Sequence, residues 1–443
     1  MNRTSYLLRT YDRPVPRYTS YPTAPHFTPN YGPTDFGAQL GAIPAGESVS
    51  LYVHLPFCQS LCWYCGCNMK VARDVNYMLA YSKAVCREIE LVSARLGRRQ
   101  KASSIHFGGG TPTWGPREGR ADIMRALQAA FELSADAEIA VEADPRTVTD
   151  DLAWELASLG VNRVSLGVQD FDPGVQDAIN RVQPFAMVER AVNALRRVGI
   201  DRINLDLMYG LPLQTAETIA HSVALALKLA PQRLALFGYA HVPWMKKHQK
   251  LLERHPLPGA AERYELFATA QQRIIDAGFI QVGLDHFAAP SDELAQAALR
   301  DTVNRNFQGY CTDTSDVVLG FGASAISALP AGYAQNDSSI ENYVAAITRG
   351  DLATLRGRAL TDDDLRRRAL IMELMCRYAV AVPPDLAADA AAALSPLVRD
   401  GLCVWEAGGV LKVTPDGRPW VRVVAACFDA YYQPAALKHP RAV

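Results

Sequence analysis

Six short apolar segments alternate with longer amphipathic segments across residues 46–245, and few folds accept this order. The short segments have the character of buried strands, whereas the longer ones have the apolar spacing of helices. Alternating strands and helices form a parallel sheet with right-handed crossovers. We predict strands at Leu51–Leu55, Ser104–Phe107, Glu138–Glu142, Arg163–Val168, Arg202–Met208 and Leu234–Tyr239, and helices at Val75–Leu96, Gly119–Phe131, Thr149–Leu159, Phe185–Val198 and Thr215–Leu229.

Polar residues at the ends of these strands indicate where a site would form. They are His54, Glu142, Gln169, Asp206 and Ala240–His241. The carboxyl ends of parallel strands meet at one edge, where α/β proteins assemble their sites. Periodicity alone leaves a doubly wound sheet and a barrel open. Five strand ends that contribute to one site favour curvature, so we predict an α/β fold with a partial parallel (β/α)6 barrel over about 49–245.

The N-terminal segment 1–48 is rich in proline, and we expect an extended arm with little regular structure of its own. The prolines are Pro14, Pro16, Pro22, Pro25, Pro29 and Pro33. Arg3, Arg9 and Asp12 interrupt the first residues and no apolar run is present, so we expect no signal peptide.

An uncharged stretch, Val317 to Gln335, has the length of a membrane span. It contains Gly320, Gly322 and Pro330, which disfavour a lipid-exposed helix. We predict a buried strand, a turn and the start of a helix within a catalytic domain that covers 49–359.

A separate C-terminal domain is predicted over 360–443. Thr361 and the three aspartates after it are typical of a helix start. Helices at Leu365–Tyr378, Leu386–Arg399 and Arg418–Tyr432, with a hairpin at Cys403–Val413 that turns at Gly408-Gly409, suggest a small, mostly helical, winged-helix-like module. Acidic and basic residues are equally frequent there, so charge gives no support to DNA binding.

The charge balance excludes functions that depend on a strong net charge of the whole molecule. The chain has 45 Lys and Arg against 46 Asp and Glu, a net charge of −1. We therefore expect no nucleic-acid or membrane partner, and an acidic ligand must be bound by local cations. We also expect a cytoplasmic protein.

Four of the nine cysteines fall within ten residues, at Cys58, Cys62, Cys65 and Cys67. A disulfide framework would spread its cysteines to close loops. A structural zinc ion needs a second pair of ligands, and no such pair is apparent. The C-x3-C-x2-C spacing of the first three suits three corners of a [4Fe–4S] cluster, which leaves the fourth iron for another ligand.

This spacing resembles the signature of radical S-adenosylmethionine (SAM) enzymes, and Cys67 narrows the resemblance to the oxygen-independent coproporphyrinogen III oxidase family. Further similar strings extend over nearly the whole chain. They are Val53-His-Leu-Pro-Phe-Cys58, Arg17-Tyr-Thr-Ser-Tyr-Pro, Gly108-Gly-Gly-Thr-Pro-Thr, Glu142-Ala-Asp-Pro-Arg, Gly167-Val-Gln-Asp-Phe, Asn204-Leu-Asp-Leu-Met-Tyr-Gly-Leu-Pro, Gly283-Leu-Asp-His-Phe-Ala and Asn306-Phe-Gln-Gly-Tyr.

The resemblance implies a set of site residues. Cys58, Cys62 and Cys65 would hold one [4Fe–4S] cluster, and Cys67 would not ligate it. A first SAM would contact Tyr52, Tyr64, Gly109, Glu142 and Ile326. A second SAM would contact Gly110, Thr111, Gln169, Arg181, Asp206 and Ala240, where Arg181 could pair with a carboxylate and Asp206 with an ammonium group or ribose hydroxyls.

The resemblance also implies an oxidoreductase of haem synthesis. A 5′-deoxyadenosyl radical would abstract hydrogen from two propionates of coproporphyrinogen III, and loss of CO₂ and an electron from each would leave vinyl groups, giving protoporphyrinogen IX. The partners would be this substrate and an electron donor such as flavodoxin or ferredoxin, and the protein would be a monomer. Arg17 and Arg305 are candidate cations for the substrate carboxylates.

Three alternatives share parts of this pattern. A radical-SAM-related haem chaperone would bind haem without oxidase activity, but its Tyr-Cys-Asp-Phe string differs from Tyr64-Cys65-Gly66-Cys67. A silent scaffold would not need intact cysteine and SAM positions. Radical SAM enzymes that open haem should lack Cys67.

Overall fold

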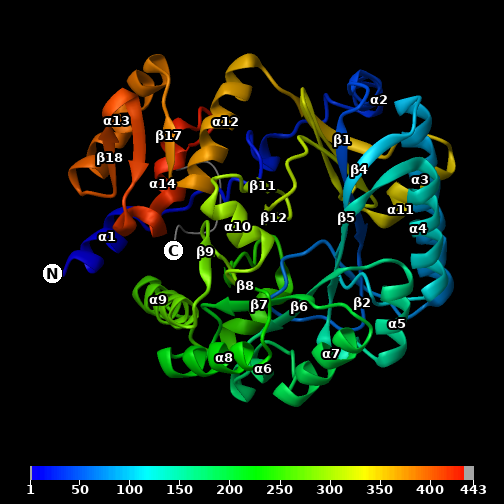
Figure 1. The fold of residues 1–443 in the computed structure, drawn as a ribbon, viewed down its shortest axis with the longest axis horizontal. Helices are drawn as coiled ribbons and strands as arrows, with labels where there is room; N and C mark the ends of the chain where they lie inside the picture. Colours follow the sequence, from blue (N-terminus) through cyan, green and yellow to red (C-terminus); the bar gives the residue numbers. More distant parts are fainter. Residues whose placement is uncertain (1, 434–443) are drawn as a thin grey trace.

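The structure is a computed structural model that describes residues 2–433. Its centre is a curved sheet of twelve strands in the order β16-β15-β14-β13-β1-β4-β5-β6-β7-β8-β10-β9. Strands β13 to β8 in this order are parallel, and the strands outside them are antiparallel. Figure 1 shows β1, β4 and β5 upright at the right and β6, β7 and β8 below them, so the parallel part wraps into an incomplete barrel.

The six predicted strands are all present and follow one another across the sheet. They are β1 (Ser48–Leu55), β4 (Gln100–Gly109), β5 (Phe131–Ala143), β6 (Arg163–Gln169), β7 (Arg202–Tyr209) and β8 (Arg233–Gly238). A seventh parallel strand, β13 (Val317–Phe321), pairs with the free edge of β1 although it lies far along the chain. The α/β class and the partial barrel are therefore confirmed.

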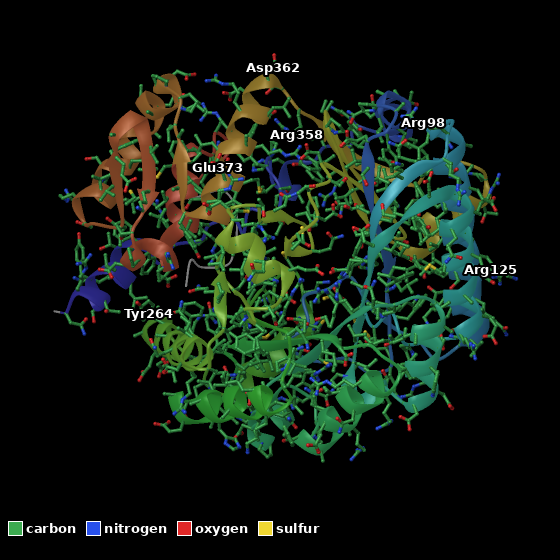
Figure 2. All side chains as sticks on the ribbon, in the orientation of Figure 1. Arg98, Arg125, Tyr264, Arg358, Asp362 and Glu373 are labelled. Atoms are coloured by element: carbon green, nitrogen blue, oxygen red, sulfur yellow. The ribbon has the colours of Figure 1, made fainter. Side chains whose placement is uncertain are left out.

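The predicted helices cover the outer face of this sheet. They are α3 (Val75–Leu96), α4 (Arg117–Ala130), α5 (Asp150–Ser158), α7 (Phe185–Arg197) and α8 (Ala216–Lys228), and α6 (Pro173–Ala178) follows β6. Their apolar faces pack on buried strand residues such as Val164, Leu205 and Leu236, which form the main core. Arg125 of α4 lies on the outside of this layer, whereas Arg98, which follows α3, lies at its upper end near the end of α2 (Pro33–Ala42) (Figure 2).

Two extensions flank the barrel. Beyond β8 lie α9 (Ala260–Asp276), β9 (Ile280–Val282), β10 (His286–Ala288), α10 (Glu293–Leu299), β11 (Asn304–Asn306) and β12 (Gly309–Cys311). Beyond β13 lie β14 (Ile326–Leu329), β15 (Gly332–Asn336), α11 (Ile340–Thr348) and β16 (Thr354–Ala359). The prediction of a helix start within Val317 to Gln335 is wrong: the stretch forms three strands, because β14 and β15 extend the sheet as an antiparallel hairpin and α11 begins only at Ile340.

The N-terminal segment has more regular structure than its prolines suggested. It contains α1 (Arg3–Tyr11), which is capped by Asn2, and α2 (Pro33–Ala42). Pro33 occupies the first turn of α2, where no main-chain N–H is needed. The expectation of an arm with little regular structure is therefore wrong for these two helices, and the prolines lie mostly between them.

The same segment joins the core of the C-terminal part. Leu7, Leu8 and Tyr11 of α1, with Tyr18 and Tyr21 after it, are buried against Leu370–Met375 and 420–428. The C-terminal part contains α12 (Asp362–Arg377), β17 (Ala379–Ala381), α13 (Pro384–Arg399), β18 (Cys403–Glu406), β19 (Val410–Val413) and α14 (Val421–Ala425). Figure 1 shows α1 beside these elements, and Figure 2 shows Asp362 at the outer end of α12.

The C-terminal elements match the predicted order except at the end. The three-stranded order β17-β19-β18 with α12 and α13 is compatible with a winged-helix-like module. The single helix predicted at Arg418–Tyr432 is wrong, since 415–428 consists of short 3₁₀ turns around α14. The backbone departs from helical geometry at Trp420, with φ of −103° and ψ of 9°, and becomes extended at Asp429, with φ of −84° and ψ of 105°, so no continuous helix forms. The domain boundaries stay predictions, and 434–443 lies outside the described residues.

Candidate active site

The cysteine loop leaves the barrel after β1 and is closed at its base. β2 (Phe57–Cys58) pairs with β3 (Lys70–Val71), and these two short strands bracket residues 59–69. Gly110 at the end of β4 packs directly on this base, because a Cβ there would lie 2.8 Å from the carbonyl of Phe57. A glycine at this position is therefore required by the chain itself, whatever else it contacts.

Side chains from another connecting segment hold the loop through its main-chain carbonyls. The Gln249 amide donates to the Tyr64 carbonyl at 2.9 Å, and the Lys246 ammonium group donates to the Cys67 carbonyl at 2.6 Å. The His248 ring nitrogen Nε2 donates to the Cys65 carbonyl at 2.8 Å. Sequence reasoning missed residues 246–249, because polar residues on a connecting segment have no spacing that marks them.

A cavity of about 250 Å³ lies between this loop and the carboxyl ends of the barrel strands. Most of the predicted site residues line it. They are Cys58, Cys62, Cys65, Tyr64, Gly109, Gly110, Thr111, Glu142, Gln169, Arg181 and Asp206. Cys67 lines it as well. The sequence prediction that one site collects residues from successive strand ends is thus matched by the geometry.

Cys62 lies beside two arginines. Nη1 of Arg181 is 3.3 Å from its sulfur and Nη2 of Arg146 is 3.5 Å from it. Asp144 forms ion pairs with both arginines, at 3.2 and 2.6 Å, and these partners hold the pKa of the buried Asp144 carboxyl below its ordinary value. Asp144 and Arg146 belong to the Glu142-Ala-Asp-Pro-Arg string, which could have drawn attention to them.

The other two cysteines have different surroundings. Thr111 Oγ1 lies 3.5 Å from the Cys58 sulfur, and burial raises the pKa of the Cys58 thiol to about 12. The main-chain N–H of Cys67 donates to the Cys65 sulfur at 3.4 Å. Hydrogen bonds from Cys67 lower the pKa of the Cys65 thiol to about 6, against the effect of burial.

The donor set fits an iron–sulfur cluster. Three thiols on one loop face one cavity, and the guanidinium groups of Arg146 and Arg181 lie beside the Cys62 sulfur, where they can balance the negative charge of a cluster. Buried Arg181 has an Nε without a hydrogen-bond partner among the described residues, which leaves a donor for an anionic group. Within residues 2–433 no three His, Cys, Asp or Glu side chains converge to hold a single metal ion.

Around Glu142 the side chains form a connected chain of contacts. Its carboxylate accepts from the main-chain N–H of Gly109 at 3.4 Å and lies 3.2 Å from Nε2 of His106. The Tyr52 ring stacks on His106, with ring centres 5.9 Å apart, and the Tyr52 hydroxyl is 3.0 Å from Nδ1 of His54. Tyr52 therefore lies next to the cavity rather than in its lining, and Ile326 belongs to the same apolar cluster as Tyr52.

Asp206 and Gln169 occupy neighbouring strand ends. The Asp206 carboxyl accepts from Ser165 at 3.0 Å and from the Asn204 amide at 2.7 Å. Burial, together with repulsion from Glu142, raises its pKa to about 6. Gln169 has a left-handed backbone with φ of 68°, an uncommon conformation for a residue with a side chain, as found at functional sites.

Five predicted residues lie outside this cavity lining: Tyr52 and Ile326, described above, and Ala240, Arg17 and Arg305. Ala240 is near the cysteine loop, since its carbonyl accepts from Gln249 at 3.3 Å, and Gln249 also contacts Tyr64. Arg17 and Arg305 line a second cavity on the other side of β8. The structure thus brings together the cysteines and most of the residues predicted to contact SAM, and separates them from the two arginines predicted to bind the substrate.

Comparison with known proteins gives the family. Residues 52–226 match the model of the radical SAM superfamily. The chain is 46% identical over 438 residues to the oxygen-independent coproporphyrinogen III oxidase of Bradyrhizobium diazoefficiens, covering 97% of both chains, and 37% identical over 440 residues to that of Escherichia coli, covering 97% and 96%.

A solved structure agrees with these relatives. The structure of coproporphyrinogen III oxidase from Escherichia coli, described as a radical SAM enzyme, superposes with a TM-score of 0.89 at 36% identity and covers 94% of this chain and 98% of its own. Full-length similarity at this level extends to the arm and the C-terminal part as well as the barrel. The chain therefore belongs to the oxygen-independent coproporphyrinogen III oxidase family of radical SAM enzymes.

Proposed function

We propose that this protein oxidatively decarboxylates two propionates of coproporphyrinogen III to vinyl groups without oxygen, giving protoporphyrinogen IX in haem synthesis. The observation that carries this proposal is the 46% identity to a coproporphyrinogen III oxidase over 97% of the chain. The protein is an oxidoreductase that uses a [4Fe–4S] cluster and SAM, as members of its family do. The full-length relatives favour this function over the haem-chaperone alternative.

The cofactor-holding residues follow from the cavity. Cys58, Cys62 and Cys65 would hold the cluster, while Arg146 and Arg181 stabilise the negative charge on Cys62. When bound, the cluster and SAM supply a one-electron reduction and a radical that abstracts hydrogen. The cysteine loop is held through its main-chain carbonyls, which fixes the positions of the thiols.

SAM residues form two groups at the strand ends. Tyr52, Tyr64, Gly109, Glu142 and Ile326 would serve the first SAM, and Gly110, Thr111, Gln169, Arg181, Asp206 and Ala240 the second. Asp206 could accept from an ammonium group or a hydroxyl, and its neighbours already orient it. The number of SAM molecules is part of the proposal.

The reaction needs redox partners. Each propionate loses a hydrogen atom, then CO₂ and one electron, so a one-electron acceptor is required. An electron donor such as flavodoxin or ferredoxin would dock near the cysteine loop. Segment 244–254 contacts that loop and carries Lys246, Lys247 and Lys250, with Trp244 49% and Met245 68% exposed, a surface that suits a negatively charged donor.

We further propose a cytoplasmic monomer without nucleic-acid or membrane partners. The balanced charge supports the absence of nucleic-acid and membrane partners, and the monomer rests on the family resemblance. Among residues 2–433, each helix is too short or too polar to cross a lipid bilayer.

The test is an anaerobic assay of the reconstituted protein with reductant, SAM and coproporphyrinogen III, in which 5′-deoxyadenosine and the porphyrins are separated by chromatography. We expect protoporphyrinogen IX together with 5′-deoxyadenosine. SAM cleavage without decarboxylation would overturn the substrate assignment. Absence of both products with tight haem binding would favour the chaperone.

A further inference from the structure

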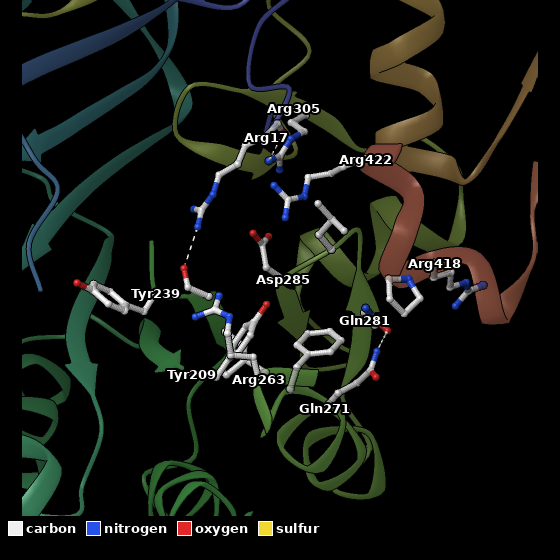
Figure 3. A pocket seen from close by; sticks show the side chains of 15 residues that line it. Arg17, Tyr209, Tyr239, Arg263, Gln271, Gln281, Asp285, Arg305, Arg418 and Arg422 are labelled. Atoms are coloured by element: carbon white, nitrogen blue, oxygen red, sulfur yellow. Dashed lines mark hydrogen bonds between the residues drawn. The ribbon is translucent and has the colours of Figure 1, made fainter. Parts of the chain in front are cut away.

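A second cavity, of about 60 Å³, lies where the barrel, the N-terminal segment and the C-terminal part meet. Figure 3 shows its lining: Arg17, Arg305 and Arg422 surround Asp285 from one side, and Arg263 approaches from the other. Arg418 completes the set of five arginines, and Asp285 is the one carboxylate among the lining residues. Even with Asp285 ionised, the cavity carries a large excess of positive charge.

Three of the arginines are anchored by main-chain carbonyls. Arg17 donates to the carbonyl of Gly238 at 3.0 Å, at the carboxyl end of β8. Arg305 donates to the carbonyls of Arg17 and Tyr18, each at 3.2 Å. Arg422 donates to the carbonyl of Val15 at 3.3 Å. These bonds orient the guanidinium groups, and because a carbonyl is neutral they do not reduce the positive charge gathered around Asp285.

The other two arginines lie over tyrosine rings. Arg263 is centred 5.5 Å from the ring of Tyr209, and Arg418 is 4.9 Å from that of Tyr378. Room for Arg263 depends on Gly210, where a Cβ would fall 2.2 Å from Nη1 of Arg263. The chain thus leaves space for a guanidinium group at the end of β7.

Two observations indicate that an anion belongs in this cavity. Nη1 of the buried Arg305 has no hydrogen-bond partner among the described residues. In addition, burial and repulsion by Arg17 lower the pKa of Arg422 to about 10, which reflects clustered like charges. A bound carboxylate would give Nη1 of Arg305 an acceptor and would reduce the repulsion among the arginines, through charge-assisted, bidentate hydrogen bonds.

The position of the cavity links it to the reaction site. Phe237 of β8 lines the cavity of the cysteines, whereas its neighbours Leu236 and Gly238 line the arginine cavity. Consecutive strand residues face opposite sides of a sheet, so only the thickness of β8 separates the two cavities. The arginine cavity has room for several water-sized groups, enough for a carboxylate but not for a macrocycle.

We propose that the arginine cavity binds the carboxylate of a propionate side chain of the tetrapyrrole while another propionate lies at the reaction site. The proposal rests on the proposed function and deepens it. Arg263, Arg418 and Arg422, together with Arg17 and Arg305, form this carboxylate subsite, and recognition there positions the macrocycle over the end of β8.

The first test compares R263M with the matched control R273M in the reconstituted holoenzyme. Arg273 lies on the same helix, is exposed and does not line the cavity. Loss of one charge-assisted contact predicts a KM for coproporphyrinogen III that rises about tenfold or more in R263M. We expect kcat to change much less and R273M to match the wild type. An unchanged KM in R263M would overturn the subsite.

A binding measurement separates the subsite from the reaction. Its probes are coproporphyrin III, the stable oxidised tetra-acid, and its uncharged tetramethyl ester. We expect the holoenzyme to prefer the acid, and R263M and R422M to lose most of this preference, with R263K restoring part of it. Variants that discriminate as well as the wild type would refute the subsite. Wild-type discrimination without turnover would instead contradict the proposed function and retain a carboxylate site.

Discussion

The cavity of the cysteines and the cavity of the arginines lie on either side of β8, but they are assembled differently. The first draws on one short loop and on the ends of consecutive strands. The second draws on Arg17, Arg263, Asp285, Arg305 and Arg422, which belong to five separate segments. The groups proposed to hold the cofactors thus come from one loop and from successive strands of the barrel, whereas those proposed to hold the substrate meet only when the whole chain is folded.

The two cavities also shift the pKa of a buried carboxyl group in opposite directions. Burial raises the pKa of Asp206, and Glu142 raises it further. Burial alone would raise the pKa of Asp285 too, but His286, Arg305 and Arg17 hold it below its ordinary value. The difference shows that the surrounding charge, rather than depth, decides which carboxyl stays ionised.

We expect the largest effect on activity from a substitution in the cavity of the cysteines. In C62A we expect cluster iron and visible absorbance to fall sharply and activity to drop to the level without enzyme, because one of the three proposed iron ligands would be missing. The measurement is iron and sulfide per chain with the anaerobic assay.

C67A and C86A serve as controls for that experiment. Cys67 is expected not to ligate the cluster, and Cys86 lies on α3 away from the cavity, so both should keep their iron. Loss of the cluster in C67A would show that the fourth cysteine is a ligand and would break the expected assignment.

A second prediction concerns stability at the arginine cavity. D285N leaves the arginines without their internal carboxylate, and we expect a loss of about 3–5 kcal/mol in the free energy of unfolding. Denaturant titration of the variant measures the loss, and coproporphyrin III should restore part of it. Wild-type stability in D285N would mean that solvent already screens the arginines.

The third prediction uses pH. Because the pKa of Asp206 is raised, the folded protein retains its proton between about pH 4 and pH 6 while the unfolded chain releases it, so stability falls as pH rises through this window. D206N should remove this fall, which amounts to about 3 kcal/mol. Unfolding free energies of both proteins across the window test it, and parallel curves would contradict it.

Asp285 should have the opposite dependence. Its lowered pKa contributes stability that is present above the unfolded pKa and is lost as pH falls into the acid range. The stability of the wild type therefore has two opposite dependences on pH, one from Asp206 and one from Asp285. The variants D206N and D285N each remove one of them.

Much of the barrel could be predicted because its signals are local. The helix Val75–Leu96 matches its prediction, since Asp74 caps its start and Gly97 ends it in a left-handed conformation. The helix α1 was missed because its apolar side chains pack against residues about 400 positions away, and nothing within the segment reveals that partner. Similarly, the segment of β15 was predicted to start a helix, because the strands that pair with it, β14 and β16, lie outside the segment itself.

The residues of the candidate site also fall into two groups, those that a sequence pattern marks and those that only the fold brings together. The cysteines and glycines follow recognisable spacings, so they could be chosen from the sequence. Lys246, His248 and Gln249 act through side-chain bonds to main-chain carbonyls, and such bonds require no motif. Isolated arginines such as Arg263 are usually solvated, and only the fold reveals that five of them share a cavity.

The union of α1 and its neighbours with the C-terminal core has a consequence for synthesis in the cell. Arg17 is made early and Arg422 near the end, so at typical ribosomal speeds roughly 20–80 s pass before both exist. The barrel can form while translation continues, whereas the arginine cavity must wait for the last segment to leave the ribosome. A nascent chain would therefore acquire its cysteine loop first and become able to retain a porphyrinogen only when it is finished.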